Sequence, residues 1–496
     1  MGEKIADPSL FPSDYFFTSD QSQLTFFPYI VAALIKMSMN LEISLFILQC
    51  ITIYLIFYGI ARITMKLFND RNVVYMTSIF LFFGSFYIAF DGAIVPFELG
   101  FAISVIGISY FLDEKRVHAM IFLGIAGLIH PLSAIFEIAA ILAYFIRKKK
   151  IKDFLISSIV AITILSPLVA NILLNGSSMK NDHAQDLVII SNMIQHGSAS
   201  LYPPIWTRGE WIGFLTIPAI LFPIIVYRKR LRGVFNDADS KILFLLIMIT
   251  IMFVAVTITF FIYPILTLVQ LQVSRAFTFF RYLLYSYLAW IIMKVNKVHR
   301  TPLMACASVL VVTSFYITQY TFYIMTIAIF IFVSFFPKMV AFINKSNLLT
   351  RTTIVATIII ATTMTCAASL NNVKQGSLVY TTDTRDWIDA QEWAKASTPK
   401  NTTFLTPVDT YNSFRVFSER SVVFGVSDKS MVLFGYQYSM DIAQRTNDFA
   451  NYNQLNQSQL VNLASKYNAE YIVIRTTTTL NLTAVYANTH YVIYQM

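Results

Sequence analysis

Residues Ile242–Pro264 read ILFLLIMITIMFVAVTITFFIYP, and no charged residue occurs between Lys241 and Arg275. An uncharged stretch of this length is typical of a transmembrane helix, because about 20 apolar residues cross the hydrocarbon core of a bilayer. The whole chain shares this character, since 56% of its 496 residues are hydrophobic and 13% are charged. That composition excludes a soluble enzyme, a disordered chain and a fibrous repeat, and it indicates an integral membrane protein with several spans.

Basic residues gather between the apolar runs and indicate the membrane topology. We predict spans at the following positions: Leu41–Ala61, Val73–Phe90, Glu98–Leu112, Asp153–Leu174, Trp211–Tyr227, Ile242–Pro264, Ala276–Met293, Thr301–Ile317, Thr321–Phe336 and Thr352–Leu370. The apolar segment Val117–Ile146 predicts two further short helices that meet at His130-Pro131. Alternation of about twelve spans places six basic clusters on one side, which the positive-inside rule assigns to the cytoplasm, and both termini on the other side.

The charge distribution bears on possible partners. Residues 1–370 carry 27 Lys and Arg against 17 Asp and Glu, whereas residues 371–496 carry 10 of each. The basic excess is scattered between apolar runs rather than collected on one solvated face, so we expect no nucleic-acid partner. Cys50, Cys306 and Cys366 all lie in apolar runs, which favours neither a disulfide framework nor a zinc site.

The chain divides into three predicted parts. Residues 1–40 form an outer acidic loop with an interfacial helix, residues 41–370 form the membrane domain with a large outer loop at 175–210, and residues 371–496 form an outer domain. An outer loop with no preceding span is unusual, so we expect either insertion with the N-terminus outside or, more readily, a helix before this start. The C-terminal part mixes predicted helices and strands, which indicates an α/β or α+β domain.

The elements predicted in the C-terminal part are helices at Asp383–Ser397 and Gln457–Lys466 and strands at Thr403–Thr406, Ser421–Gly425, Glu470–Ile474 and Tyr491–Tyr494. No Gly-rich phosphate loop opens either helix. Residues Thr403–Ser421 combine apolar side chains with charged ones, and we expect this segment to pack over the mouth of a membrane cavity. The alternative is a freely tethered surface domain.

Four acidic residues near the outer membrane face are candidate catalytic groups. Asp7 and Asp14 precede the first span, and Asp91 and Glu98 flank the short turn between the second and third spans. A carboxylate at this depth can take a proton from an acceptor hydroxyl or hold a divalent cation such as Mg²⁺ or Mn²⁺, with Asp91 and Glu98 as the candidate ligands. The alternative for each single residue is a solvated loop charge.

Basic and aromatic residues supply candidate binding groups. Arg275 and Arg281 lie in the outer half of a span, and a guanidinium there suits a phosphate group, although snorkelling to lipid headgroups is the alternative. His130 lies at the apex of the short hairpin, as a phosphate or sugar contact or as a structural group. His196 and Trp206 in the large outer loop could contact a sugar or form the core of that loop.

Three stretches carry a resemblance to a known family: Gly-Leu-Ile-His-Pro at 127–131, Leu-Gln-Val-Ser-Arg at 271–275, and the tail segment from Thr398 to Ser421. With the span count and acidic loops, the chain resembles the GT-C superfamily of integral-membrane glycosyltransferases, and more narrowly a prokaryotic multi-span group of that architecture. The resemblance implies a polytopic, mainly α helical bundle of GT-C type with a C-terminal exoplasmic domain. It also matches Asp7 and Asp14 to the first acidic loop of that family, and Asp91 and Glu98 to the second.

The resemblance further implies a lipid-phosphate-linked sugar as donor. The leading hypothesis is therefore a plasma-membrane glycosyltransferase that moves a sugar from a polyprenyl-phosphate carrier to an acceptor glycan, lipid or protein on the exoplasmic side. In this hypothesis Asp7 or Asp14 is the general base, and Arg275 and His130 stabilise the departing phosphate. The rival is a non-enzymatic transporter or a polysaccharide-export or assembly protein, although the internal repeat expected of many transporters is absent from the sequence.

Overall fold

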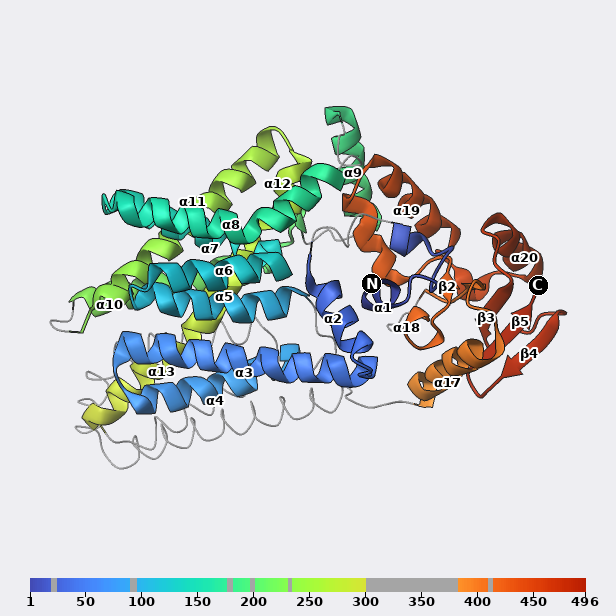
Figure 1. The fold of residues 1–496 in the computed structure, drawn as a ribbon, viewed down its shortest axis with the longest axis horizontal. Helices are drawn as coiled ribbons and strands as arrows, with labels where there is room; N and C mark the ends of the chain where they lie inside the picture. Colours follow the sequence, from blue (N-terminus) through green and yellow to red (C-terminus); the bar gives the residue numbers. More distant parts are fainter. Residues whose placement is uncertain are drawn as a thin grey trace, which may run out of the picture.

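The computed structural model describes residues 1–18, 25–89, 96–175, 182–196, 201–230, 234–299, 382–408 and 414–496. In these residues a bundle of long helices lies at one end of the molecule and a smaller domain of mixed helix and strand lies at the other (Figure 1). The N-terminal segment is located between the two parts (Figure 1). The predicted spans at Thr301–Ile317, Thr321–Phe336 and Thr352–Leu370 lie outside the described residues.

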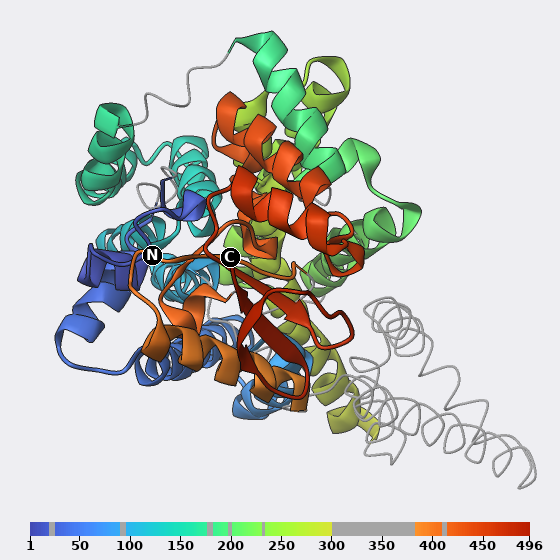
Figure 2. The same cartoon turned by 90° about the vertical axis from the view of Figure 1, so that its right-hand side faces the viewer.

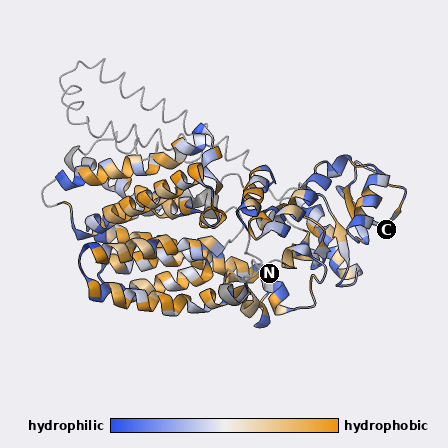
Figure 3. Ribbon diagram, turned by 90° about the horizontal axis from the view of Figure 1, so that it is seen from above, coloured by the Kyte–Doolittle hydropathy of each residue, from blue (hydrophilic) through white to orange (hydrophobic). Residues whose placement is uncertain are grey.

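The bundle consists of apolar helices that follow the predicted spans. Their bounds are α3 Leu41–Phe68, α4 Arg71–Ala89, α5 Pro96–Leu112, α6 Arg116–Ile129, α7 Ile135–Arg147, α8 Ile151–Asn175, α10 Arg208–Arg230, α11 Asp237–Ile262, α12 Leu266–Gln270 and α13 Phe277–His299. Five helical segments of the described chain are long and apolar enough to cross a bilayer. The protein is therefore a mainly helical, multi-span membrane protein. Apolar residues dominate the bundle, whereas polar residues are more frequent in the C-terminal domain (Figure 3).

Side-chain capping sets where two of the long helices begin. Asn40 accepts a hydrogen bond from the backbone N–H of Glu42 at the start of α3, and Asn236 and Asp239 form a reciprocal capping box at the start of α11. Helix α3 ends at Phe68, and Asn69 after it caps the helix in the left-handed conformation, with φ 47°. Such caps satisfy backbone groups that have no partner inside the helix, so both helices have defined boundaries.

The predicted hairpin at His130-Pro131 is confirmed. Helix α6 ends at Ile129, a short 3₁₀ helix η3 covers Pro131–Ser133, and α7 begins at Ile135. His130 itself is extended, with φ −155° and ψ 107°, as expected for a residue before proline. Beside the apex, the Phe26 N–H donates a hydrogen bond to the Leu128 carbonyl at 2.9 Å, so the hairpin ends next to the N-terminal segment, which lies between the bundle and the C-terminal domain (Figure 1).

Ion pairs join several loops at the opposite end of the bundle. Arg62 of α3 pairs with Asp113 after α5 at 2.8 Å, and Arg116 pairs with Asp153 of α8 at 2.5 Å. Lys241 at the start of α11 lies 2.6 Å from Asp237. These contacts place the basic residues of several predicted clusters at a common end, in agreement with alternation of the spans.

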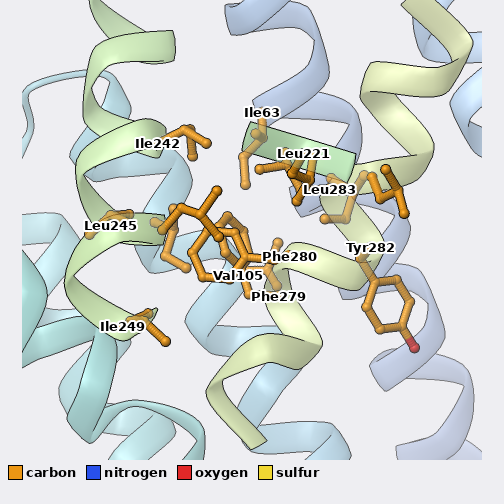
Figure 4. Close-up of a cluster of buried hydrophobic side chains, with 14 of the residues drawn as sticks. Ile63, Val105, Leu221, Ile242, Leu245, Ile249, Phe279, Phe280, Tyr282 and Leu283 are labelled. Atoms are coloured by element: carbon orange, nitrogen blue, oxygen red, sulfur yellow. The ribbon is translucent and has the colours of Figure 1, made fainter. Parts of the chain in front are cut away.

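The centre of the bundle is an apolar core. Side chains from α3, α5, α10, α11 and α13 meet in it and include Ile63, Val105, Leu221, Ile242, Leu245, Ile249, Phe279, Phe280 and Leu283 (Figure 4). All of these side chains are almost fully buried. Inside a bilayer, contacts of this kind hold helices together by close packing rather than by exclusion of water.

The C-terminal domain contains a five-stranded mixed sheet of order β2-β1-β3-β5-β4. Its strands are β1 Thr403–Leu405, β2 Ser421–Val422, β3 Tyr471–Arg475, β4 Thr483–Ala487 and β5 Tyr491–Gln495. Strand β1 pairs in parallel with β2 and β3, whereas β5 pairs antiparallel with β3 and β4. Its helices are α17 Thr382–Ser397, α18 Arg415–Ser418, the 3₁₀ helix η8 Val426–Leu433, α19 Tyr436–Asp448 and α20 Gln457–Lys466.

Most of the helices and strands predicted for the C-terminal domain are confirmed. Helix α20 has the predicted bounds, and α17, β1, β3 and β5 lie within one or two residues of prediction. Strand β2 is shorter than the predicted Ser421–Gly425, and β4 and α19 were not predicted.

The C-terminal domain packs on one end of the bundle through the loop between α8 and α10. Helix α9 (His183–His196) of that loop packs against α19 and η8 (Figure 2). Ile189, Ile190 and Met193 of α9 share one apolar cluster with Met431 and Ile442 of the domain. In addition, Gln270 Nε2 donates a hydrogen bond to the Leu433 carbonyl at 2.6 Å. The domain is therefore packed on the bundle rather than freely tethered.

Candidate functional site

Three segments far apart in sequence meet at the bundle end that faces the C-terminal domain. The guanidinium of Arg275 lies over the Phe97 ring, with its Cζ 5.1 Å from the ring centroid. The His130 ring packs edge-on against the same ring, with centroids 5.4 Å apart. Phe97 stands in the first turn of α5, His130 at the hairpin apex, and Arg275 in the 3₁₀ helix η7 (Val273–Ala276) before α13. This Phe97–His130–Arg275 cluster combines two of the predicted site residues.

The close approach of the hairpin to α5 depends on Gly100. A Cβ atom built on Gly100 would collide with the Ser133 hydroxyl and would lie 3.2 Å from the His130 Cβ. Ser133 in turn donates to the His130 carbonyl at 2.7 Å. A residue without a side chain therefore lets the hairpin apex sit directly on α5, and this contact fixes His130 beside Phe97.

Two polar atoms near this cluster are buried without a hydrogen-bond partner in the described part of the chain. They are His130 Nδ1 and Gln272 Oε1. A buried polar atom without a partner is unfavourable, and such atoms call for a specific explanation. Gln272 also holds the left-handed conformation, with φ 45°, directly before η7. The two atoms and the Arg275 guanidinium provide hydrogen-bonding capacity that a polar ligand could use.

Glu98 follows Phe97 directly in α5 and is half-buried, whereas Asp91 lies outside the described residues. Arg281, also half-buried, lies in the second turn of α13. Glu98 is therefore the only one of the two predicted metal ligands whose position is described. Within the described ranges, no group of three or more His, Cys, Asp or Glu residues is arranged to hold a metal ion.

Asp14 is in a different setting from the one expected of a solvent-facing base. Its side chain is 0% exposed, and its Oδ2 accepts hydrogen bonds from Arg415 Nε at 2.6 Å and from the Val422 backbone N–H at 2.8 Å. Asp428 binds the same guanidinium through two contacts of 2.8 Å. Burial acts to lower the pKa of Arg415, but the two carboxylates outweigh burial and raise it, so the guanidinium stays charged.

Asp7 is exposed and pairs with Lys400 of the C-terminal domain at 2.8 Å. The hydrogen bonds from Lys400 and Ser9 hold the pKa of Asp7 well below its usual range. Together with the Asp14–Arg415 contact and a 2.6 Å hydrogen bond from the Tyr15 hydroxyl to Asp441, this pair fastens the N-terminal segment to the C-terminal domain. The first acidic loop is therefore a docking element of that domain.

The N-terminal segment also borders a cavity of about 790 Å³. The lining residues with carboxylates are Glu3, Asp7, Glu42, Glu392 and Glu419, and the apolar lining includes Ile35, Met39 and Phe417. Burial, with a smaller contribution from Glu419, raises the pKa of Glu3 to about 7. Sequence reasoning missed Glu3, because its burial depends on contacts with residues almost 400 positions away.

His196 and Trp206, the two site residues predicted in the loop at 175–210, have no recorded contact with the Phe97–His130–Arg275 cluster in the described residues. His196 is the last residue of α9, on the helix that packs against the C-terminal domain. Trp206 packs among Trp211, Phe214 and Phe253, with ring centroids 5.1 to 6.1 Å away. Trp206 therefore packs against the apolar core of the bundle, and the sugar contacts expected of His196 and Trp206 stay predictions.

Comparison of this chain with known proteins finds a match to one family model, no significant match among curated proteins, and a similar fold in two solved structures. Residues 385–431 match the model of a family described as a domain of unknown function, DUF6798. No curated protein matches the sequence significantly.

Two solved GT-C glycosyltransferase structures match the fold over nearly the whole chain at low sequence identity. One is the archaeal oligosaccharyltransferase AglB from Archaeoglobus fulgidus in complex with an inhibitory peptide and a dolichol-phosphate. It matches with a TM-score of 0.48 and 12% identity over 96% of this chain, which spans 64% of the length of AglB. The other is ArnT from Cupriavidus metallidurans bound to undecaprenyl phosphate, with a TM-score of 0.44 and 11% identity over 99% of this chain and 96% of that one.

Proposed function

We propose that this protein is a membrane glycosyltransferase that moves a sugar from a polyprenyl-phosphate carrier to an acceptor glycan, lipid or protein. In the proposed topology of about twelve spans, the basic loop end of the bundle faces the cytoplasm. The C-terminal domain and the Phe97–His130–Arg275 cluster then face the exoplasmic side of the plasma membrane. The family resemblance in the sequence motivates the reaction class.

The observation that carries the proposal is the meeting of Arg275 and His130 around Phe97. A guanidinium presents paired N–H donors that match the oxygens of a phosphate. His130 Nδ1 has no partner among the described residues, so the imidazole is available to a ligand. A residue pair of this kind within an apolar bundle fits a phosphate group that is attached to a lipid chain.

The proposed reaction is substitution at the anomeric carbon of the sugar. The bond between this carbon and the phosphate oxygen breaks, and a bond to the acceptor oxygen or nitrogen forms. The acceptor proton passes to a carboxylate, and the polyprenyl phosphate leaves with the electron pair. Arg275 and His130 would stabilise the charge that develops on the phosphate, which is the electrostatic contribution that usually dominates such chemistry.

Among the candidate acids, we propose Glu98 or Asp91 for the proton transfer, because Glu98 adjoins Phe97 in α5. Asp7 remains a second candidate. For Asp14 we propose docking instead, since the carboxylate is buried and bound by Arg415 and Val422. His196, Trp206 and Arg281 remain candidate substrate contacts at the outer face.

The candidate cofactor is a divalent cation such as Mg²⁺ or Mn²⁺, with Asp91 and Glu98 as its ligands. Of these two ligands the structure describes Glu98 alone, and the proposed reaction assigns no step to a cation. Activity measured with and without a chelator would test this point.

The test uses the full chain in lipid nanodiscs with undecaprenyl phosphate as the probe. We expect saturable binding that Arg275→Ala and His130→Ala weaken roughly tenfold or more, because a hydrogen bond to a charged group contributes about 1.5–3 kcal/mol. Arg147→Ala at the basic end is the matched control and should bind normally. Unchanged binding in both site variants would contradict the proposal, as would the failure of every tested undecaprenyl-phosphate sugar to release undecaprenyl phosphate.

A further inference from the structure

The C-terminal domain contains a second cavity, of about 400 Å³. It lies between η8, the end of α19 and the 3₁₀ helix η9 (Tyr452–Gln454). Its volume falls in the range of about 300–1,000 Å³ that is typical of small-molecule sites. None of its lining residues belongs to the bundle or to the Phe97–His130–Arg275 cluster.

Aromatic side chains form the floor of this cavity. Phe449 lies parallel to Tyr452, with ring centroids 5.6 Å apart and an interplanar angle of 6°, and Phe424 packs against Phe449 at 5.5 Å. The Tyr452 hydroxyl donates to the carbonyls of Val473 at 2.9 Å and Leu405 at 3.2 Å. The floor is thus anchored to the neighbouring strands β1 and β3, and the cavity has a preformed shape.

The rim of the cavity is rich in side-chain amides. Asn447, Asn451, Asn453 and Gln454 are exposed around it. Each amide can both donate and accept hydrogen bonds, which suits a ligand with many hydroxyl groups. Thr446 also lines the cavity, and its Oγ1 is buried without a hydrogen-bond partner in the described ranges.

Lys429 is the one charged residue in the described lining, which contains no Asp or Glu. Among the described residues, Lys429 forms no ion pair. Because no described carboxylate pairs with the Lys429 ammonium at the edge of this amide-rich cavity, the ammonium would attract an anionic group. The cavity therefore differs from the acidic cavity around Glu3, which would attract cations.

We propose that this cavity binds a saccharide residue that carries a carboxylate, as in a uronic acid. The amide rim would bind the hydroxyl groups, the buried aromatic side chains would close the bottom of the cavity, and Lys429 would pair with the carboxylate. The inference goes beyond the proposed transfer reaction, because it requires none of the residues at the bundle end. It gives the C-terminal domain a role in holding an acidic glycan near the membrane.

The test measures oligosaccharide binding to the full chain in detergent by saturation-transfer NMR and calorimetry. The probes are a glucuronate-containing hyaluronan tetrasaccharide, the neutral maltotetraose, and inorganic phosphate. We expect saturable binding of the acidic tetrasaccharide, weaker binding of the neutral one, and no competition by phosphate. Lys429→Gln should weaken binding of the acidic tetrasaccharide roughly tenfold and leave that of the neutral one unchanged.

Asn451→Ala should weaken binding of both tetrasaccharides, whereas Gln444→Ala, an exposed position on α19 outside the cavity, serves as the matched control. Circular dichroism and melting curves confirm that each variant is folded. Absence of binding, equal effects of Lys429→Gln and Gln444→Ala, or displacement by phosphate alone would each overturn the proposal. The variants Arg275→Ala and His130→Ala should bind the acidic tetrasaccharide normally, so failure of the transfer hypothesis and failure of this one are distinguishable.

Discussion

Arg415 Nε donates a hydrogen bond to Asp14 Oδ2 at 2.6 Å, although 401 positions separate the two residues in sequence. Both side chains are buried, with 5% exposure for Arg415 and 0% for Asp14. The Val422 backbone N–H donates to the same Asp14 oxygen, so the carboxylate also caps the edge of β2. This contact explains how the N-terminal segment and the C-terminal domain form a single layer at one end of the bundle.

Substitution of Asp14 by Ala should loosen this layer. The change removes one of the two carboxylates that neutralise a buried guanidinium and leaves the Val422 N–H without its acceptor. Breaking a buried ion pair costs about 3–5 kcal/mol when the remaining charge has no partner, and because Asp428 stays in place we expect a loss of about 2–3 kcal/mol. Hydrogen–deuterium exchange of residues 1–18 should become faster, and the melting temperature should fall.

Asp7→Ala is the matched control for this experiment. Asp7 pairs with Lys400 at the surface, and exposed pairs of this kind contribute about 0–1 kcal/mol. The control should therefore leave exchange in residues 1–18 nearly unchanged. If Asp14→Ala had the same small effect as Asp7→Ala, the docking role of Asp14 would be wrong.

The raised pKa of Glu3 predicts that the stability of the protein depends on pH. Its folded-state pKa of about 7 is above its ordinary value because of burial and, to a smaller extent, Glu419. The folded state therefore holds the proton more tightly than the unfolded state, and stability declines as pH rises from about 4.5 to about 7. Glu3→Gln should remove this decline, with a gain on the order of 1–3 kcal/mol at pH 8 and little change at pH 4.5.

Melting curves of wild type and Glu3→Gln in detergent across this pH range would test the prediction. Glu42→Gln is the control, because Glu42 lines the same cavity but is exposed at the start of α3. Parallel pH profiles for wild type and Glu3→Gln would show that the Glu3 carboxyl does not titrate in this range.

Local patterns in the sequence predicted most of the elements but few of the contacts between them. The hairpin at His130-Pro131 could be predicted because basic clusters flank both ends of one apolar run and a proline interrupts its middle. Strand β4 (Thr483–Ala487) could not, since its side chains are exposed or half-buried and no apolar alternation marks it. Helix α19 was missed because its sequence, YQYSMDIAQRTND, is mostly polar.

The candidate site shows the same division. Arg275 and His130 were selected because charged or titratable groups are rare in apolar spans, and the structure brings both to Phe97. The role of Phe97 itself could not be predicted, because one Phe among 43 carries no signal. The burial of Asp14 likewise depends on Arg415 and Val422, and a contact across 401 positions leaves no trace in local sequence.

Gly100→Ala should displace the hairpin apex from α5. The added methyl group would meet the Ser133 hydroxyl and approach the Ala126 carbonyl to 3.2 Å. Overpacking of this kind costs about 1–3 kcal/mol, and here it also moves His130 away from Phe97. We expect a lower melting temperature together with weaker binding of undecaprenyl phosphate.

Ser133→Ala provides a rescue test of this mechanism. Removal of the hydroxyl in the double variant Gly100→Ala/Ser133→Ala takes away the closest contact of the new methyl group. Part of the lost stability and binding should therefore return. A double variant as impaired as the sum of the two single variants would indicate that the collision with Ser133 is not the cause.

The basic end of the bundle contains a buried pair whose loss should have a larger effect. Arg228 and Asp239, with exposures of 1% and 0%, form two hydrogen bonds of 3.0 and 2.8 Å. The guanidinium also packs against the rings of Phe68 and Trp290, with its Cζ 4.6 and 4.4 Å from their centroids. The topology prediction treated Arg228 as one of several loop charges, but it joins α10, α11 and α13.

Arg228→Met should therefore destabilise the bundle by about 3–5 kcal/mol, because it leaves the Asp239 carboxylate buried without its cation. The double variant Arg228→Met/Asp239→Leu removes both charges and should recover much of that loss. The neighbouring Lys229→Met is the control, since Lys229 is exposed at the end of α10. Melting temperatures in one detergent would rank the four proteins, and a double variant less stable than Arg228→Met would show that the ion pair itself is not what the bundle requires at this position.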